Sequence, residues 1–443
     1  MNPVSAKLAV LHLITALLLG AVLASLSGVL KLAVAPYLAY LLYEKRSEHF
    51  PALVVLMNYG TILTVAGAVL IIPIAVRSLW KIEDAFISRF LKLLLLMLPV
   101  YVVITVMRMG SGTALTDALV MNDYYIAFWF LLYGVIIYEQ FSHQNLGYFI
   151  TFGLLLFLIL RIGLGGVDPF GALYRQMNYF LIFGILLVAD HLLYVRTRHS
   201  WVFYLLFFVV FFLFIPAIKF TFYFGLILAL FALRNWQQRG NTFTTSGYFK
   251  EQIYPKLLPL FPVLFLVVTI WLTPFFASDY SKVNVGNDSN TMLEKLLFKL
   301  FWDRGQIWSG ALDGILFNTG LLPPIREWKL TYTAIGNNSL ENEYEVDFES
   351  HNLILGLIRY NGYLLGGILI YLFLTAMRQL YNAKAYLLGR QRVLAVSMIG
   401  LGIAVFITGQ YILQLNTSFL FMSVIGSLIA YSKSLQAFRS YEQ

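Results

Sequence analysis

The chain has 443 residues, of which 60% are hydrophobic and only 12% are charged, and its net charge is +9. Soluble domains carry about 25% charged residues, so this composition excludes an ordinary water-soluble domain. Cysteine is absent, which excludes disulfides and thiol chemistry. Most of the cations cluster in short loops between apolar segments, where they set membrane orientation, so they do not indicate nucleic-acid binding.

Apolar segments that approach the length of a bilayer crossing follow one another along most of the chain. They run over approximately 7–25, 28–43, 52–76, 88–107, 124–138, 146–161, 177–194, 201–215, 217–233, 257–275, 352–376, 393–413 and 416–432. The first segment lacks a clear small-residue cleavage site, and we expect it to be retained as a span. The pattern predicts an all-α polytopic membrane protein with about 12 transmembrane helices.

Basic residues indicate the orientation of the C-terminal half. Three regions contain clusters of cations: the loop after residue 233, the loop after residue 376, and the tail. All three regions are predicted to be cytoplasmic. The long segment 276–350 then faces the opposite side. We therefore divide the chain into an N-terminal transmembrane bundle (1–275), a periplasmic loop (276–350), and C-terminal transmembrane helices with a cytoplasmic tail (351–443).

The 276–350 loop contains two different patterns. A capping box at Thr291 and Glu294 precedes an apolar stripe at helical spacing, which predicts an amphipathic helix on the membrane surface. Arg304 and Trp308 continue that line, one helical turn apart. Acidic residues alternate with apolar ones over most of 341–349, which predicts an extended strand with an acidic edge. Carboxylates about 7 Å apart on a strand are too far apart to converge on one ion, so we expect no metal. No Walker loop, dinucleotide fingerprint or haem motif occurs in the sequence, so we expect no cofactor.

His351 and Asn352 stand where the outward loop meets an apolar helix. The simplest interpretation of His351 is an interfacial side chain that hydrogen-bonds a neighbour. The alternative is a general base, because the positive end of the helix dipole disfavours imidazolium and keeps the ring neutral. Asn352 is then a candidate to orient a ring or bind a sugar hydroxyl.

Several cations are candidate contacts for an anionic headgroup on the outer side. Arg304 can grip a diphosphate with its planar fork, and Trp308 can support a sugar or a lipid stem. Lys219, at the start of a span, is a second candidate, and Arg161 and Arg175 flank a glycine-rich turn on the same side. The competing interpretation is that the cations snorkel to lipid headgroups and Trp308 anchors at the interface.

Two short motifs in the region 300–370 resemble the bacterial O-antigen polymerase and O-antigen ligase superfamily. The first is R-x-x-I-W, and the second is H-N-x-x-L with trailing glycines; their residues are Arg304, Ile307, Trp308, His351, Asn352, Leu355, Gly362 and Gly366. The layout of about 12 spans with one long late periplasmic loop is similar too. Many members have a Ser-Arg pair at the start of an earlier span, where this chain has Ile218-Lys219. Lysine keeps the charge there but lacks the planar fork.

The resemblance implies a metal-independent GT-C-type glycosyltransferase in the bacterial inner membrane, with its site facing the periplasm. The donor is then a glycan on undecaprenyl diphosphate, and the acceptor is another lipid-linked glycan for a polymerase or lipid A core for a ligase. His351 corresponds to the residue that activates the acceptor hydroxyl, and Arg304 to a diphosphate contact. Membrane lipids and a chain-length regulator protein are the further partners, and no nucleic acid is expected.

Three functions therefore remain open at this point. A polymerase, with a ligase as its near alternative, fits cations and a neutral histidine on the outer side. A flippase for the same lipid class would favour charged residues deep within spans and paired half-repeats. A non-catalytic scaffold predicts that Arg304 and His351 lie far apart.

Overall fold

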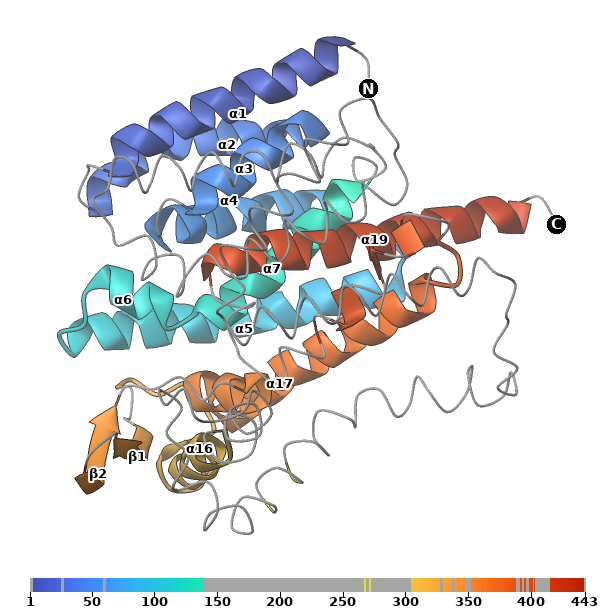
Figure 1. Ribbon diagram of the computed structural model, residues 1–443. Helices are drawn as coiled ribbons and strands as arrows, with labels where there is room; N and C mark the ends of the chain where they lie inside the picture. Colours follow the sequence, from blue (N-terminus) through green and yellow to red (C-terminus); the bar gives the residue numbers. More distant parts are fainter. Residues whose placement is uncertain are drawn as a thin grey trace, which may run out of the picture.

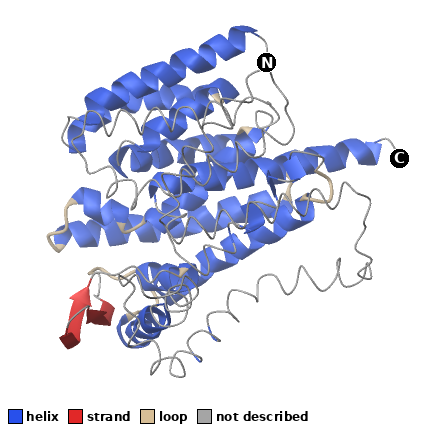
Figure 2. Cartoon of the chain, viewed as in Figure 1, coloured by secondary structure: helices blue, strands red, loops and turns tan. Residues whose placement is uncertain are grey.

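The computed structural model describes residues 3–24, 28–58, 61–138, 304–326, 330–336, 339–346, 352–387 and 415–441, with single positions at 267 and 271 and several between 391 and 402. Within these residues the chain forms helices and one short β-hairpin (Figures 1 and 2). The predictions for the side chains of Arg161, Arg175, Lys219 and His351, and for an amphipathic helix over 291–301, lie outside the described residues.

The described elements follow the apolar segments of the sequence. In chain order they are α1 (Pro3–Ala24), η1 (Gly28–Val34), α2 (Ala35–Glu44), η2 (Ser47–His49), α3 (Phe50–Asn58), α4 (Thr61–Leu79), α5 (Ala85–Gly110), α6 (Leu115–Val120), α7 (Asp123–Ile136), α16 (Arg304–Asn318), β1 (Leu330–Gly336), β2 (Ser339–Val346), α17 (Leu353–Ala383) and α19 (Leu415–Tyr441). The apolar segment 52–76, expected as one element, is divided between α3 and α4.

Four of the described helices are long and apolar enough to cross a bilayer: α4, α5, α17 and α19. These helices indicate a membrane-embedded protein. The helix α17 continues to Ala383, so Arg378 lies within the helix and not in the loop expected after residue 376. Of the two shorter apolar helices, 123–136 (α7) packs on α19 and α4, and 7–20 (within α1) packs on α3.

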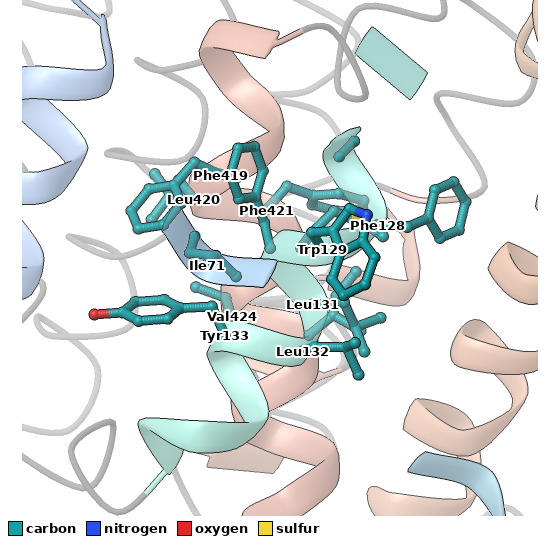
Figure 3. Packing of buried hydrophobic residues seen from close by; sticks show 14 of the residues in the cluster. Ile71, Phe128, Trp129, Leu131, Leu132, Tyr133, Phe419, Leu420, Phe421 and Val424 are labelled. Atoms are coloured by element: carbon teal, nitrogen blue, oxygen red, sulfur yellow. The ribbon is translucent and has the colours of Figure 1, made fainter. Parts of the chain in front are cut away.

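The centre of the fold is the contact between α7 and α19 (Figure 3). Every residue of α7 from Tyr124 to Val135 is buried, as expected for a helix that is apolar on all sides. A Cβ built on Gly134 would overlap the backbone of Ser423, and the Ser423 hydroxyl donates to the carbonyl of Phe130 at 3.1 Å. Small residues thus allow the two backbones to approach closely, as at other membrane helix contacts.

One ion pair joins the start of α5 to α19. Asp84 caps α5 by accepting a hydrogen bond from the Ile87 amide at 2.9 Å, and its second oxygen accepts from the Lys433 ammonium. Lys433 belongs to the tail, whose cations predict a cytoplasmic location, and the ion pair joins the start of α5 to this tail.

The hairpin lies beside α16, near the start of α17 (Figure 1). The strands β1 and β2 are antiparallel, with Tyr332 opposite Tyr344 and Thr333 opposite Glu343. The extended strand predicted from the acidic alternation is therefore confirmed up to Val346. Its partner strand was not predicted.

Candidate functional site

The candidate site lies where α16, the segment 319–326, the first half of α17 and the end of α5 meet. The helix α17 begins with a side-chain cap. The Asn352 oxygen accepts hydrogen bonds from the amides of Ile354 at 2.9 Å and Leu355 at 3.2 Å. Because Asn352 is 1% exposed, its place at the end of the helix is fixed by packing as well as by the cap. The residue before it is His351.

A small apolar cluster joins the two helices that carry the motifs. Its buried members are Ile307, Trp308, Ala311 and Ile315 of α16 and Leu355 of α17. Arg304 is the first residue of α16 and lies one turn before Trp308, whereas Leu355 lies four residues after His351. The cluster therefore brings the early turns of both motif-bearing helices side by side. The Arg304 side chain is not among those that the structure describes.

Trp308 is fully buried in this cluster. It therefore packs between α16 and α17 and does not anchor at an exposed interface. Contact between Trp308 and a sugar or lipid stem stays a prediction.

A break in α17 holds the segment that follows α16. Gly362 has a φ of +74° and a ψ of 173°, which interrupts the helix. The amides of Tyr363 and Leu364 then donate to the carbonyls of Gly320 and Leu321, each at 3.0 Å. The backbone approaches so closely that a Cβ on Gly362 would lie 2.5 Å from the carbonyl of Leu322. Irregular backbone within a membrane protein is tolerated where protein satisfies its polar groups in this way.

A buried arginine from α5 holds the same segment from the other side. The guanidinium of Arg108 donates to the carbonyl of Pro324 at 2.8 and 3.1 Å and to the Asn122 oxygen at 2.8 Å. The Asn122 amide in turn donates to the Thr105 hydroxyl at 2.7 Å. Arg108 is 0% exposed, so this network supplies the polar partners that a buried cation requires.

The polar network continues into the middle of α17. The Tyr101 hydroxyl donates to the Asn361 oxygen at 2.7 Å, and the Asn361 amide donates to the carbonyl of Leu357 at 2.9 Å. Tyr101 also stacks on Tyr125 of α7, with ring centroids 4.0 Å apart. Three helices are thereby joined next to the break at Gly362.

A second buried guanidinium belongs to α17 itself. Arg359 is 1% exposed, and its Cζ lies 5.1 Å from the centroid of the Tyr360 ring. That ring stacks on Tyr124 of α7, with centroids 5.6 Å apart. The site region thus contains two cations deep in the fold. An anionic group near them would be stabilised more strongly than in water because the surroundings are of low dielectric.

Arg108, Arg359 and the network around them were not singled out from the sequence. Arg359 carried a usable signal, because an ionisable residue inside an apolar span is by default a candidate functional residue. Arg108 lies just after the predicted apolar segment 88–107, where position alone does not distinguish a loop cation from a buried one. Its burial depends on the neighbours that the fold supplies.

Comparisons with family models, with curated proteins and with solved structures give no match. Function is therefore inferred from this chain's own residues.

Proposed function

We propose that this chain is a membrane glycosyltransferase that polymerises undecaprenyl-diphosphate-linked oligosaccharides at the periplasmic face of the bacterial inner membrane. The proposal includes about 12 spans, with 276–350 as the periplasmic loop. The observation that carries it is the shared apolar cluster of α16 and α17, since it brings the segment beginning at Arg304 beside the segment that follows His351. A non-catalytic scaffold would not require the start of α16 to lie beside the start of α17.

In the proposed reaction the neutral His351 ring accepts the proton of an acceptor sugar hydroxyl. The hydroxyl oxygen attacks the anomeric carbon of the donor glycan and forms the new glycosidic bond. The bond between that carbon and the diphosphate oxygen breaks, and undecaprenyl diphosphate leaves with the electron pair. No nucleotide is consumed, because the donor is already activated.

Cations balance the charge that develops on the departing diphosphate. We assign this role to Arg304 and Lys219, with Arg161 and Arg175 as further contacts. Arg304 offers a fork that matches phosphate oxygens, whereas Lys219 offers a point charge. The depth of Arg359 and Arg108 in the same region supports a site that keeps positive charge away from water.

The capped start of α17 supports the role of His351. Asn352 fixes the first turn of the helix directly after the histidine. The positive end of a helix dipole there disfavours a second positive charge on the ring. A neutral ring is the form that can act as a base at neutral pH.

The test is a reconstituted reaction with purified protein and its lipid-linked repeat unit. His351→Ala is expected to lower the rate of glycosidic bond formation about 10²- to 10⁴-fold, the usual contribution of a general base. Arg77→Ala is the control, because Arg77 is an exposed cation at the end of α4, outside the candidate site, and it is expected to retain activity.

Three results would contradict the proposal. Unchanged polymer length with His351→Ala at normal protein levels would refute the base assignment. Transfer of the glycan to lipid A core, with no polymer, would identify a ligase. Movement of labelled lipid across vesicles without any new bond would identify a transporter.

A further inference from the structure

A second polar cluster lies far from the candidate site along the chain, where η2 packs against α1. It contains His12 of α1, Tyr37 and Tyr40 of α2, and His49 of η2. His12 is 8% exposed and His49 is 0% exposed. A histidine within an apolar helix is costly to bury and points to a function with a nearby partner. The proposed glycan transfer uses none of these residues.

The two imidazole rings lie against each other. Their centroids are 4.5 Å apart and their planes are inclined by 79°. The Nε2 atoms of both rings are buried and have no hydrogen-bond partner among the residues that the structure describes. Buried polar atoms are rarely left unsatisfied, so two adjacent ones need an explanation.

The Nδ1 atoms indicate what the Nε2 atoms can do. His49 Nδ1 lies 3.3 Å from the carbonyl of Leu41. A carbonyl can only accept, so Nδ1 carries the proton and Nε2 presents its lone pair. His12 Nδ1 lies 2.8 Å from the Tyr37 hydroxyl, which can accept in the same way. Metal-binding histidines usually donate their other ring N–H to such a group, which orients the ring.

The spacing of the rings fits two ligands on one ion. With metal–nitrogen bonds of about 2.0–2.1 Å, an ion lies about 3.2 Å from each ring centroid, and ligand angles of about 90–109° place the centroids about 4.5–5.2 Å apart. The measured 4.5 Å lies at the lower end of this range. A linear two-coordinate ion would require about 6.4 Å on the same bond lengths, which excludes that geometry.

We propose that His12 and His49 bind a divalent transition-metal ion of the zinc class through their Nε2 atoms. In the described part of the chain no group of three His, Cys, Asp or Glu forms a metal site, so water completes the coordination. The Tyr40 ring centroid lies 5.7 Å from that of His49, and Tyr40 is 49% exposed, so the cluster lies near the surface of the described fold. The ion ties α1 to η2.

The charge state of the rings is compatible with this role. Burial lowers the pKa of the His49 ring, and the neighbouring His12 lowers it further. The neutral imidazole that results near neutral pH is the form that binds metals.

The experiment uses the full-length protein in detergent after removal of metals. Zn²⁺ affinity is measured by competition with a chromophoric chelator, and Cu²⁺ is used as a probe whose electron paramagnetic resonance spectrum counts coordinating nitrogens. We expect one ion per chain and two imidazole nitrogens. His12→Gln and His49→Gln should each weaken binding at least ~10-fold, and Tyr37→Phe should weaken it by about 10-fold through loss of the orienting contact.

His351→Ala is the matched control, since it removes a histidine from another part of the chain and should leave Zn²⁺ affinity unchanged. Failure of the wild-type protein to bind Zn²⁺ or Cu²⁺ would overturn the proposal, and so would unchanged binding by the His12→Gln/His49→Gln double variant. If a glutamine variant does not fold, the wild-type Cu²⁺ spectrum and the Tyr37→Phe affinity still decide. The binding measurement does not depend on polymer formation. Failure of the metal-site proposal can therefore be distinguished from failure of the transferase proposal.

Discussion

Replacement of Gly362 by alanine tests whether the break in α17 organises the candidate site. Two costs combine at this position. A φ of +74° with a ψ of 173° is a conformation essentially restricted to glycine, and such strain costs about 1–3 kcal/mol in other residues. The added Cβ would lie 2.5 Å from the Leu322 carbonyl, and overpacking of this kind costs about 1–3 kcal/mol.

The two costs together predict a loss of about 2–6 kcal/mol from the free energy of unfolding. That is a large part of the total stability of a typical domain, which is about 5–15 kcal/mol. The backbone next to Gly362 also hydrogen-bonds to the segment that follows α16. The Gly362→Ala variant should therefore lose the contacts between α16 and α17. We expect glycan transfer to fall together with stability.

The measurement is reversible unfolding of purified protein in mixed micelles of mild detergent and sodium dodecyl sulfate. Gly367→Ala is the control on the same helix, because a Cβ at this position would have nothing within 4 Å of it. It should be neutral or stabilising by about 0.5–1 kcal/mol, as for glycine within a helix. Equal stability of Gly362→Ala and Gly367→Ala would refute the reasoning.

Three further substitutions test other contacts by the same unfolding measurement. Arg108→Met removes the donors to the Pro324 carbonyl and should cost about 3–5 kcal/mol, the usual loss when one partner of a buried charged network is removed; a loss below about 1 kcal/mol would contradict a role in holding this segment. Gly134→Ala should force α7 and α19 apart and cost about 1–3 kcal/mol, whereas Gly110→Ala, with open space around its Cβ, should not. Asn352→Ala should cost about 1 kcal/mol and Asn352→Ser much less, because serine also caps helices; equal losses would argue against the cap.

Much of the helical framework could be predicted from hydropathy alone. The long helices α5, α17 and α19 coincide with apolar segments because an isolated apolar run in a membrane satisfies its backbone only as a helix. The division of 52–76 into α3 and α4 was missed. Asn58 and Gly60 within that segment are turn-favouring residues that could have indicated it.

The hairpin shows where local pattern is sufficient and where it is not. Period-two alternation predicted an extended conformation for β2, since alternate residues of a strand point to opposite faces. The partner strand β1 depends on a register that only the folded chain defines, such as Leu330 opposite Val346. Strand pairing therefore could not be predicted from single segments.

For the candidate site, too, one part could be predicted from local sequence and another part could not. Arg304 and Trp308 were expected on one helix, and α16 contains both. The packing of α16 on α17 and the contact of Arg108 with Pro324 join residues 40 or more positions apart. No local spacing encodes such contacts, so the polar network becomes visible only in the fold.

The pairing of α7 with α19 has a consequence for how the protein is made. The carbonyl of Phe130 and the hydroxyl of Ser423 are separated by 293 residues, so the ribosome must add that length of chain before the two can meet. Until then the face of α7 that later contacts α19 must lie against lipid, insertion machinery or temporary neighbours. Biogenesis therefore includes a late step in which α19 packs against α7.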